Sequence, residues 1–443
     1  MTMMKRLVGL AALGMATAMT PVAVSAQVQA PAAAQAEMPT PFVSLQELAS
    51  RYVAENKVAN MVIGVGIPGG MTFWVDDGTL AMGGTTEADE QSIYRIYSMT
   101  KPVIGIAAAL LIEDGTIGLD QPLSDFYPEF AEMHVLSDPD TPGATVAAKN
   151  AITIRHLLTH TAGLGYSIIP SGIADLYREQ GIVPGQRRPN PMSPSGEQPA
   201  DLDEFMQRLA ALPLRNEPGT EWSYSISLDV MGAVIEKAAR MPLEEFLETR
   251  VFQPLGMDDT GFVVPEEDLD RLTTNYFMFN GNMMPIDGPA DSEYAEAPPF
   301  PSGGGGLAST AEDYMRFLTA LANGGMVGGQ QALPAGAVEL ATSNILPSEA
   351  EFQLSFGITE ASGPSQGYGA GGFVITDASG PLPVGTFGWG GAAGTLAYAN
   401  PASRSAIVMM TQYMPLGAYP LSQELGAALA ADTARLMGGA NDN

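Results

Sequence analysis

The stretch "SMTKPVIGIAAALLIEDG" (residues 98–115) decides the fold. Its apolar part is hydrophobic nearly all round, which predicts a buried helix that ends at Gly115. Ser98 stands at the capping position of this helix, and Pro102 falls in the first turns, where proline is tolerated. Lys101, at the head of a buried helix, has no evident structural purpose and needs an explanation.

Spacing suggests a chemical role for this lysine. Residues three apart on a helix share a face, with Cβ atoms about 5–6 Å apart, so the Lys101 amine can reach the Ser98 hydroxyl. Burial and the positive end of a helix both disfavour the charged form of a lysine, which favours its use as a base. A serine beside a base is an activated nucleophile. An S-x-x-K tetrad also arises by chance, and the alternative is a lysine that extends to solvent.

Strand patterns lie at both ends of the chain. Residues 61–78 predict two strands joined by a Pro-Gly-Gly turn, and residues 384–401 and 404–414 predict a later hairpin pair. We expect the early and late strands to pair. The predicted fold class is α+β, an antiparallel sheet flanked by helices, with a large inserted region that is mainly helical.

The domain boundaries follow from these patterns. Residues 42–97 and 341–437 are predicted to form a discontinuous sheet domain, and residues 98–340 a mainly helical domain. The helical part holds two Pro/Gly-rich segments, 184–201 and 285–306, predicted to be functional rims or lids. An active site is expected where the two parts meet.

The N-terminus has the order of a secretory signal peptide. Lys5 and Arg6 precede an apolar stretch and small residues, with cleavage expected after Ala26, so residues 1–26 are removed. Residues 27–41 are Ala/Pro/Gln-rich and predict a disordered leader. The expected localisation is periplasmic or secreted, with no stable membrane anchor; the alternative is an N-terminal anchor.

Composition limits the function further. The whole chain has a net charge of −29, from 20 Lys+Arg and 49 Asp+Glu residues. Such a surface repels phosphate backbones, so no nucleic-acid partner is expected. The absence of cysteine excludes disulfides and a cysteine nucleophile. No cofactor or metal is predicted, and the oligomeric state is left open.

Several motifs together resemble the serine beta-lactamase-like superfamily, which includes class C beta-lactamases, penicillin-binding proteins and family VIII carboxylesterases. The resemblance covers about residues 45–435. The motifs occur in the family's order: "SMTK" (98–101), "HLLTHTAGL" (156–164), "EWSYSISLDVMG" (221–232), "GGGGLASTAEDYMRF" (303–317) and "FGWGGAAGT" (387–395).

The resemblance assigns roles at matching positions. Ser98 and Lys101 match the catalytic pair, and Tyr224 matches the tyrosine that shares their proton and passes it to the leaving group. The backbone amides of Ser98 and Ala392 would form the oxyanion hole. Without the resemblance, a buried core tyrosine is the alternative for Tyr224.

Two departures from the family favour esters as substrates. Trp389, with Gly390 and Gly391, occupies the third motif, where many relatives carry a cation that faces a substrate carboxylate. Ile226 replaces the second-motif asparagine that contacts a substrate amide. These four residues are predicted to bind substrate, and the replacements are similar to those of family VIII carboxylesterases.

We therefore expect a carboxylesterase that acts through an acyl-enzyme on Ser98, with a small-molecule ester as its partner. Two alternatives stay open. One is a beta-lactamase, D-amino-acid peptidase or linear-amide hydrolase on the same scaffold, and the other is a non-catalytic binding relative.

Two further patterns carry less weight. "GPSQG" (363–367) fits the G-x-S-x-G elbow around Ser365, but the sequence after it does not predict the helix that an elbow requires. His156 and His160 are spaced i, i+4 like a zinc pair, without the glutamate of H-E-x-x-H or a further ligand cluster. A turn and a structural role are the favoured interpretations.

Overall fold

The computed structural model describes residues 41–141, 143–185, 187–188, 195–352, 366–379 and 382–439. The predicted signal peptide and all of the predicted leader except Pro41 lie outside these residues. Within the described part of the chain, none of the helices combines the length and the apolar character that a membrane span requires.

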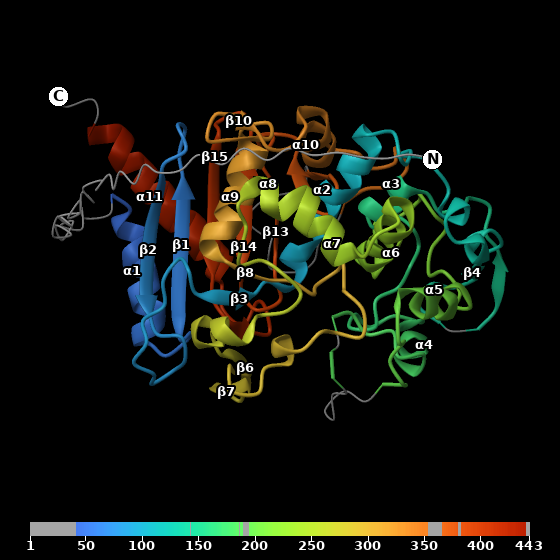
Figure 1. The fold of residues 1–443 in the computed structure, drawn as a ribbon, viewed down its shortest axis with the longest axis horizontal. Coiled ribbons are helices and arrows are strands. Elements are labelled where there is room, and N and C mark those ends of the chain that lie inside the picture. The colour runs from blue at the N-terminus through green and yellow to red at the C-terminus, as the bar shows by residue number, and fades with distance from the viewer. Residues whose placement is uncertain are drawn as a thin grey trace, which may run out of the picture. The chain divides into compact units, whose positions relative to one another are not determined.

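A seven-stranded antiparallel sheet is the centre of the fold (Figure 1). The early strand β1 pairs with the late strand β15, with Val62 opposite Met410, so both ends of the chain contribute to one sheet as the sequence predicts. The sheet order is β11-β12-β13-β14-β15-β1-β2. The bounds are β1 Asn60–Gly66, β2 Thr72–Gly78, β11 Gln366–Tyr368, β12 Phe373–Ile375, β13 Phe387–Gly390, β14 Leu396–Asn400 and β15 Ser405–Met410.

Helices cover the sheet. The first helix, α1 (Val43–Ala54), and the last, α11 (Leu421–Gly439), pack against each other, and α1 also packs on β1 and β2. Helix α9 (Ala311–Ala322) contacts β15, β14 and β1, and Figure 1 shows it on the side of the sheet away from α1 and α11. The predicted α+β class is confirmed.

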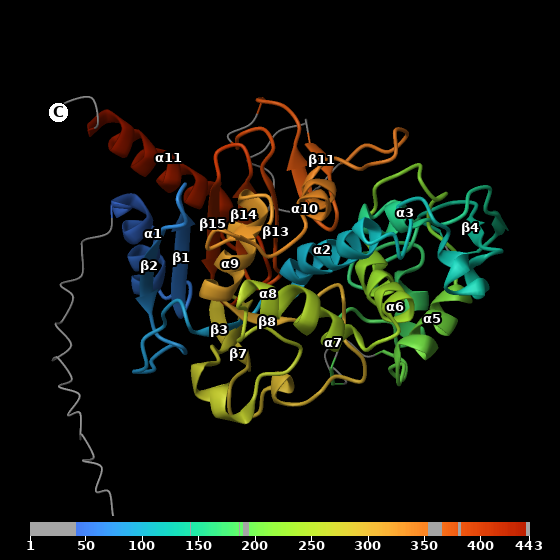
Figure 2. The same cartoon turned by 45° about the horizontal axis from the view of Figure 1, so that its top comes forward.

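Helix α2 (Thr100–Glu113) connects the sheet to the helical region and lies between them in both views (Figures 1 and 2). All of its residues from Thr100 to Leu111 are buried, which explains why its sequence is apolar on every side. It ends as predicted, because Gly115 adopts φ +71°, a left-handed conformation typical of the residue after a helix.

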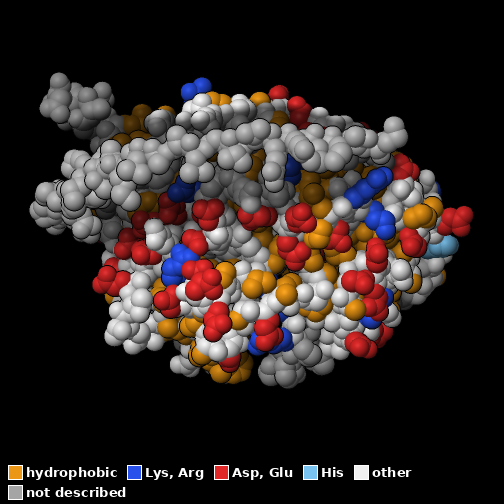
Figure 3. All heavy atoms as spheres, in the orientation of Figure 1, with side chains coloured by type: hydrophobic (Ala, Val, Ile, Leu, Met, Phe, Trp, Pro, Cys, Tyr) orange, Lys and Arg blue, Asp and Glu red, His pale blue; other side chains and the backbone are white. Residues whose placement is uncertain are grey.

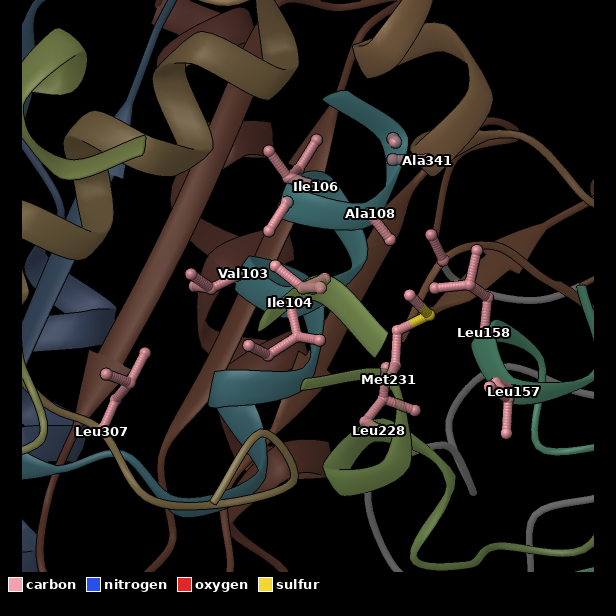
Figure 4. Packing of buried hydrophobic residues seen from close by; sticks show 14 of the residues in the cluster. Val103, Ile104, Ile106, Ala108, Leu157, Leu158, Leu228, Met231, Leu307 and Ala341 are labelled. Atoms are coloured by element: carbon pink, nitrogen blue, oxygen red, sulfur yellow. The ribbon is translucent and has the colours of Figure 1, made fainter. Parts of the chain in front are cut away.

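The rest of the helical region packs around α2. Helices α6 and α10 contact α2 directly, and α3 and α5 contact α6. Figure 4 shows Leu228 and Met231 of α6 close to Leu157 and Leu158 of α3 beside the α2 side chains. The bounds are α3 Ile154–Leu158, α4 Ala174–Glu179, α5 Leu202–Ala210, α6 Ser227–Ala239, α7 Leu243–Leu247, α8 Gln253–Leu255 and α10 Ala335–Thr342.

Some elements were not predicted. Part of the 285–306 segment, expected to be irregular, belongs to strand β7 (Asn282–Asp287), which pairs with β6 (Asn275–Phe279) and makes a small sheet with β16 (Tyr413–Met414). The remaining short strands are β3 Ile93–Arg95, β4 His134–Leu136, β5 Thr145–Ala147, β8 Ala308–Thr310, β9 Met326–Val327 and β10 Gln330–Gln331. The predicted boundaries between a sheet domain and a helical domain stay a prediction.

Acidic side chains spread across the face shown in Figure 3, in keeping with the strongly negative charge of the sequence.

Candidate active site

Ser98 lies on a tight turn, not at a helix cap. The predicted capping role is wrong: Tyr97–Met99 form a 3₁₀ turn, the residue before α2 is Met99, and no side chain caps the helix. Tyr97 has φ +43°, which is strained for a non-glycine residue. Its hydroxyl is held by Asn275 Nδ2 at 2.9 Å. The turn leaves the Ser98 hydroxyl free of helix capping and directs it to other partners.

Lys101 is completely buried and contacts Ser98, as the sequence predicts. Its Nζ lies 3.2 Å from Ser98 Oγ. It also donates to the backbone carbonyl of Gly304 at 2.6 Å and lies 3.5 Å from the Tyr166 hydroxyl. A buried amine needs such partners, because an unpaired charge in the interior is costly. These contacts fix the amine beside the nucleophile.

Tyr224 completes the group on the other side of Ser98. Its hydroxyl lies 2.8 Å from Ser98 Oγ, and its ring lies 4.6 Å from Lys101 Nζ. The indole Nε1–H of Trp389 donates to the same phenolic oxygen at 3.3 Å. The Lys101 amine and the Trp389 indole N–H therefore both lie next to Tyr224, and the indole N–H is a hydrogen-bond donor to its phenolic oxygen.

Two free amides stand where the oxyanion hole is predicted. In the described parts of the chain, the backbone N–H groups of Ser98 and Ala392 have no acceptor. Strand β13 contacts the Tyr97–Met99 turn, called the nucleophile turn below. Gly391, the residue after β13, lies so close to this part of the chain that a Cβ would be only 2.4 Å from the Ile96 carbonyl oxygen. Glycine here allows the close approach. The use of both amides as an oxyanion hole stays a prediction.

The other predicted substrate-binding residues are buried. Trp389 is 1% exposed and packs with Tyr368 and Phe373 in an aromatic cluster. Ile226 is also 1% exposed, just before α6, and Gly390 ends strand β13 opposite Leu396. Besides these ring contacts, Trp389 donates its indole N–H to Tyr224. A direct role in substrate binding stays a prediction for Trp389, Gly390, Gly391 and Ile226.

Tyr166 is a site residue that the sequence interpretation missed. Besides its contact with Lys101, its ring meets the Tyr224 ring edge to face, with centroids 5.2 Å apart. Burial, with a smaller effect of Tyr224, raises the pKa of Tyr166 well above its usual range, so it stays a neutral phenol. It lies on a loop without periodicity, and no motif quoted above includes it.

The two histidines do not share a helix. Helix α3 ends at Leu158, and His160 has φ +55°, so the expected i, i+4 arrangement on one helix is wrong. His156 instead takes part in a capping box with Thr153. Among the described residues, no group of three or more His, Cys, Asp or Glu could hold a metal ion.

The His160 ring packs against the Tyr224 ring. The two ring centroids are 4.8 Å apart, and His160 Nδ1 accepts the Ser225 backbone N–H at 3.2 Å. Burial, with the nearby Lys101 charge, lowers the pKa of His160 well below its usual range, so the ring is neutral. Sequence reasoning gave His160 a structural role, which this packing fits.

The rival nucleophile Ser365 lies outside the described residues. The chain that follows it begins strand β11 at Gln366, not a helix. That strand does not provide the context that a G-x-S-x-G elbow requires.

Comparisons with known proteins identify the family of this chain. The beta-lactamase family model matches residues 45–432. The chain belongs to the beta-lactamase family. It is 34% identical over 349 residues to the protein Rv1367c of Mycobacterium tuberculosis, covering 76% of this chain and 81% of the relative.

Two other similar proteins are named for an activity. The esterase EstB of Burkholderia gladioli is 33% identical over 341 residues, covering 73% of this chain and 78% of that protein. The solved structure of EstCE1, described as a hydrolase with promiscuous acyltransferase activity, is 26% identical. It superposes with a TM-score of 0.69 over 88% of this chain and 98% of its own.

Proposed function

We propose that this chain hydrolyses carboxylic esters through an acyl-enzyme on Ser98. The observation that carries the proposal is the contact of Ser98 Oγ with both Tyr224, at 2.8 Å, and Lys101, at 3.2 Å. A serine hydroxyl held between a phenolic oxygen and an amine has a route for its proton. The likeness to the esterase EstB supports an ester as the bond that is cleaved.

The first half of the reaction forms the acyl-enzyme. Ser98 Oγ attacks the ester carbonyl carbon while its proton passes to the Tyr224–Lys101 pair. The carbonyl oxygen, now negative, accepts hydrogen bonds from the Ser98 and Ala392 amides. When the carbon–oxygen bond to the alcohol breaks, the pair returns the proton to the leaving alkoxide. The alcohol leaves, and the acyl group stays on Ser98.

The second half releases the acid. A water molecule gives its proton to the same pair and attacks the acyl carbonyl, which forms a second tetrahedral oxyanion. Collapse of this intermediate breaks the bond to Ser98 Oγ, which recovers the proton, and the carboxylic acid departs. An alcohol in place of water would give acyl transfer, the promiscuous activity named for EstCE1.

The local chemistry favours an ester over a lactam that carries a carboxylate. Trp389 stands where many beta-lactamase relatives have a cation, and its indole N–H is directed to Tyr224. Ile226 offers no hydrogen bond to a substrate amide and is buried. The groups that would recognise an acylamino carboxylate are replaced at both positions.

A pair of serine variants tests the proposal. Ser98→Ala should lower the turnover of p-nitrophenyl butyrate by about 10⁴-fold or more, because nucleophile and base act as one unit. Ser365→Ala should stay near wild type. A fluorophosphonate probe should add one label to the wild type and none to Ser98→Ala by intact mass. An inactive Ser365→Ala with an active Ser98→Ala would overturn the assignment, and turnover of nitrocefin in preference to esters would overturn the substrate class.

Export is part of the same proposal. The charged, apolar and small-residue order of residues 1–26 supports cleavage after Ala26 and release to the periplasm or medium. N-terminal sequencing of the protein recovered from a Gram-negative expression host should begin at Gln27. Recovery of the protein with Met1 intact in the cytoplasm would contradict it.

A further inference from the structure

The backbone carbonyl of Gly304 is the shortest contact of the Lys101 amine. Lys101 Nζ donates to this oxygen at 2.6 Å, against 3.2 Å to Ser98 Oγ. The lysine stem has four rotatable bonds, so its amine needs a fixed acceptor to stay aligned with the nucleophile. The position of the Gly304 carbonyl therefore helps to set the position of the amine.

Gly304 lies in a run of four glycines, residues 303–306, which forms a turn without a regular element of its own. The turn is closed by the Ser302 carbonyl, which accepts the backbone N–H of Gly306 at 3.0 Å. Glycine has no side chain to pack, so this turn cannot be fixed by its own side chains. Something outside the run must hold it against α2.

The side chain of Asp229, on helix α6, packs against this turn. It is 2% exposed, and its Oδ1 accepts the Ser302 hydroxyl. Its Oδ2 faces Gly304 so closely that a Cβ at position 304 would lie 2.2 Å away. One carboxyl group thus contacts both the residue that closes the turn and the residue that anchors Lys101.

The other side of the turn is held by separate groups. The Leu307 backbone N–H donates to Thr100 Oγ1 of α2 at 3.1 Å, and Arg187 Nη2 donates to the Gly306 carbonyl at 2.9 Å. These contacts fix the end of the turn after Gly304. Asp229 and Ser302 are the contacts at its start, so the two sets together define where the Gly304 carbonyl points.

We propose that Asp229 is a positioning residue for catalysis, which holds the Gly304 carbonyl in place and so aligns Lys101 with Ser98. The inference rests on the roles proposed above for Ser98 and Lys101. Burial raises the pKa of Asp229, while the Ser302 hydroxyl and the Lys101 charge lower it. The role needs a hydrogen-bond acceptor of the right shape at this position, which an amide oxygen also supplies.

The kinetics of three variants test whether Asp229 positions Lys101. Asp229→Ala removes the acceptor and should lower kcat for p-nitrophenyl butyrate by about 10²-fold with KM nearly unchanged, since a small misplacement of a catalytic group costs this much. Asp229→Asn keeps the shape and the acceptor oxygen and should retain kcat within about fivefold of wild type. Val234→Ala, a buried change on the same helix, should reduce thermal stability without changing kcat.

A double-mutant cycle tests the path through Ser302. Ser302→Ala should also lower kcat, and Asp229→Ala combined with Ser302→Ala should match Asp229→Ala alone within about twofold, because both remove one contact. Ser302→Ala is the milder change and keeps the test valid if Asp229→Ala does not fold.

Three results would overturn the proposal: unchanged kcat in Asp229→Ala or Ser302→Ala, a kcat in Asp229→Asn as low as in Asp229→Ala, or additive losses in the double variant. These differ from a failure of the proposed function, which would appear as retained activity in Ser98→Ala.

Discussion

The Tyr224 hydroxyl lies closer to Ser98 Oγ than the Lys101 amine does, at 2.8 Å against 3.2 Å. The Lys101 amine makes its shortest contact with the Gly304 carbonyl. The Tyr224 phenolic oxygen accepts a hydrogen bond from the Trp389 indole N–H. This arrangement favours Tyr224 as the group that takes the serine proton directly. To accept this proton Tyr224 must release its own, and the Lys101 amine, which lies 4.6 Å from the Tyr224 ring, then receives it as the second member of the pair.

Tyr224→Phe removes the phenolic oxygen and keeps the ring. Because the ring still packs against His160, we expect a folded protein with kcat for p-nitrophenyl butyrate reduced by about 10²–10⁴-fold. Labelling by a fluorophosphonate should slow by a similar factor, since the same proton transfer activates Ser98. Wild-type kinetics in this variant would exclude Tyr224 from proton transfer.

Lys101→Met keeps a long apolar stem in the buried position and removes only the amine. We expect a reduction of kcat by about 10²–10⁴-fold, because the pair loses the group that shares the proton. Circular dichroism should show a fold like the wild type, which separates the chemical loss from unfolding. A variant that keeps a tenth or more of wild-type turnover would show that Tyr224 works without the amine.

Trp389→Phe separates two roles of one side chain. The substitution keeps an aromatic ring in the cluster with Tyr368 and removes the hydrogen bond to Tyr224. A hydrogen bond of about 1.5 kcal/mol predicts a fall in kcat of about tenfold with KM unchanged. The matched control is Trp222→Phe: the Trp222 ring stacks on Tyr224, but its indole nitrogen has no partner among the described residues. A change confined to KM in Trp389→Phe would favour the substrate contact predicted from sequence.

The main elements of the site could be predicted because their signals are local. The S-x-x-K spacing places Lys101 near Ser98 on any helical turn, and the apolar run identifies α2 as buried. Pairing of the early and late strands follows from their patterns, since strands left unpaired at both chain ends would expose edges. Tyr224 needed the family resemblance, because a lone tyrosine before a helix has no distinctive pattern.

The remaining contacts have no such signal. Tyr166 approaches Lys101 from a loop, and the Gly304 anchor is a backbone carbonyl, which every residue possesses. Capping of α2 by Ser98 was wrong because the left-handed Tyr97 forms a separate turn before the helix. The alternation of residues along a strand predicts which face of the sheet carries Trp389. It does not predict which side chain Trp389 contacts, so its hydrogen bond to Tyr224 could not be foreseen.

Asp313 should make folding stability depend on pH. Burial raises its pKa to about 6, although Thr260 donates a hydrogen bond to its Oδ2 at 2.8 Å. A carboxyl group with a raised folded-state pKa contributes stability that is fully present below its unfolded pKa of 3.8 and is lost as the pH rises through about 6. Asp313→Asn keeps the acceptor oxygen and does not ionise.

We therefore expect the variant to gain in unfolding free energy relative to wild type between pH 4 and pH 6, by an amount on the order of 2 kcal/mol. Urea denaturation of both proteins at several pH values measures this difference. A difference that does not change with pH would show that Asp313 titrates normally.

Gly391→Ala tests how closely strand β13 must approach the nucleophile turn. The added Cβ would lie 2.4 Å from the Ile96 carbonyl oxygen and 2.3 Å from Thr395 Oγ1, so the strand end has to shift away from Ser98. The shift moves the Ala392 amide, and loss of one oxyanion donor should lower kcat by about 10²–10³-fold.

The control for this substitution is Gly426→Ala on α11, where an added Cβ meets nothing within 4 Å. It should keep wild-type turnover and stabilise the helix slightly, because alanine is the better helix former. The decisive measurement is inhibition by a trifluoromethyl ketone, which forms an oxyanion on Ser98. Gly391→Ala should bind this inhibitor more weakly than wild type, by the same factor as its loss in kcat. Inhibitor binding equal to that of wild type, together with a lower kcat, would mean that the two amides do not hold the oxyanion.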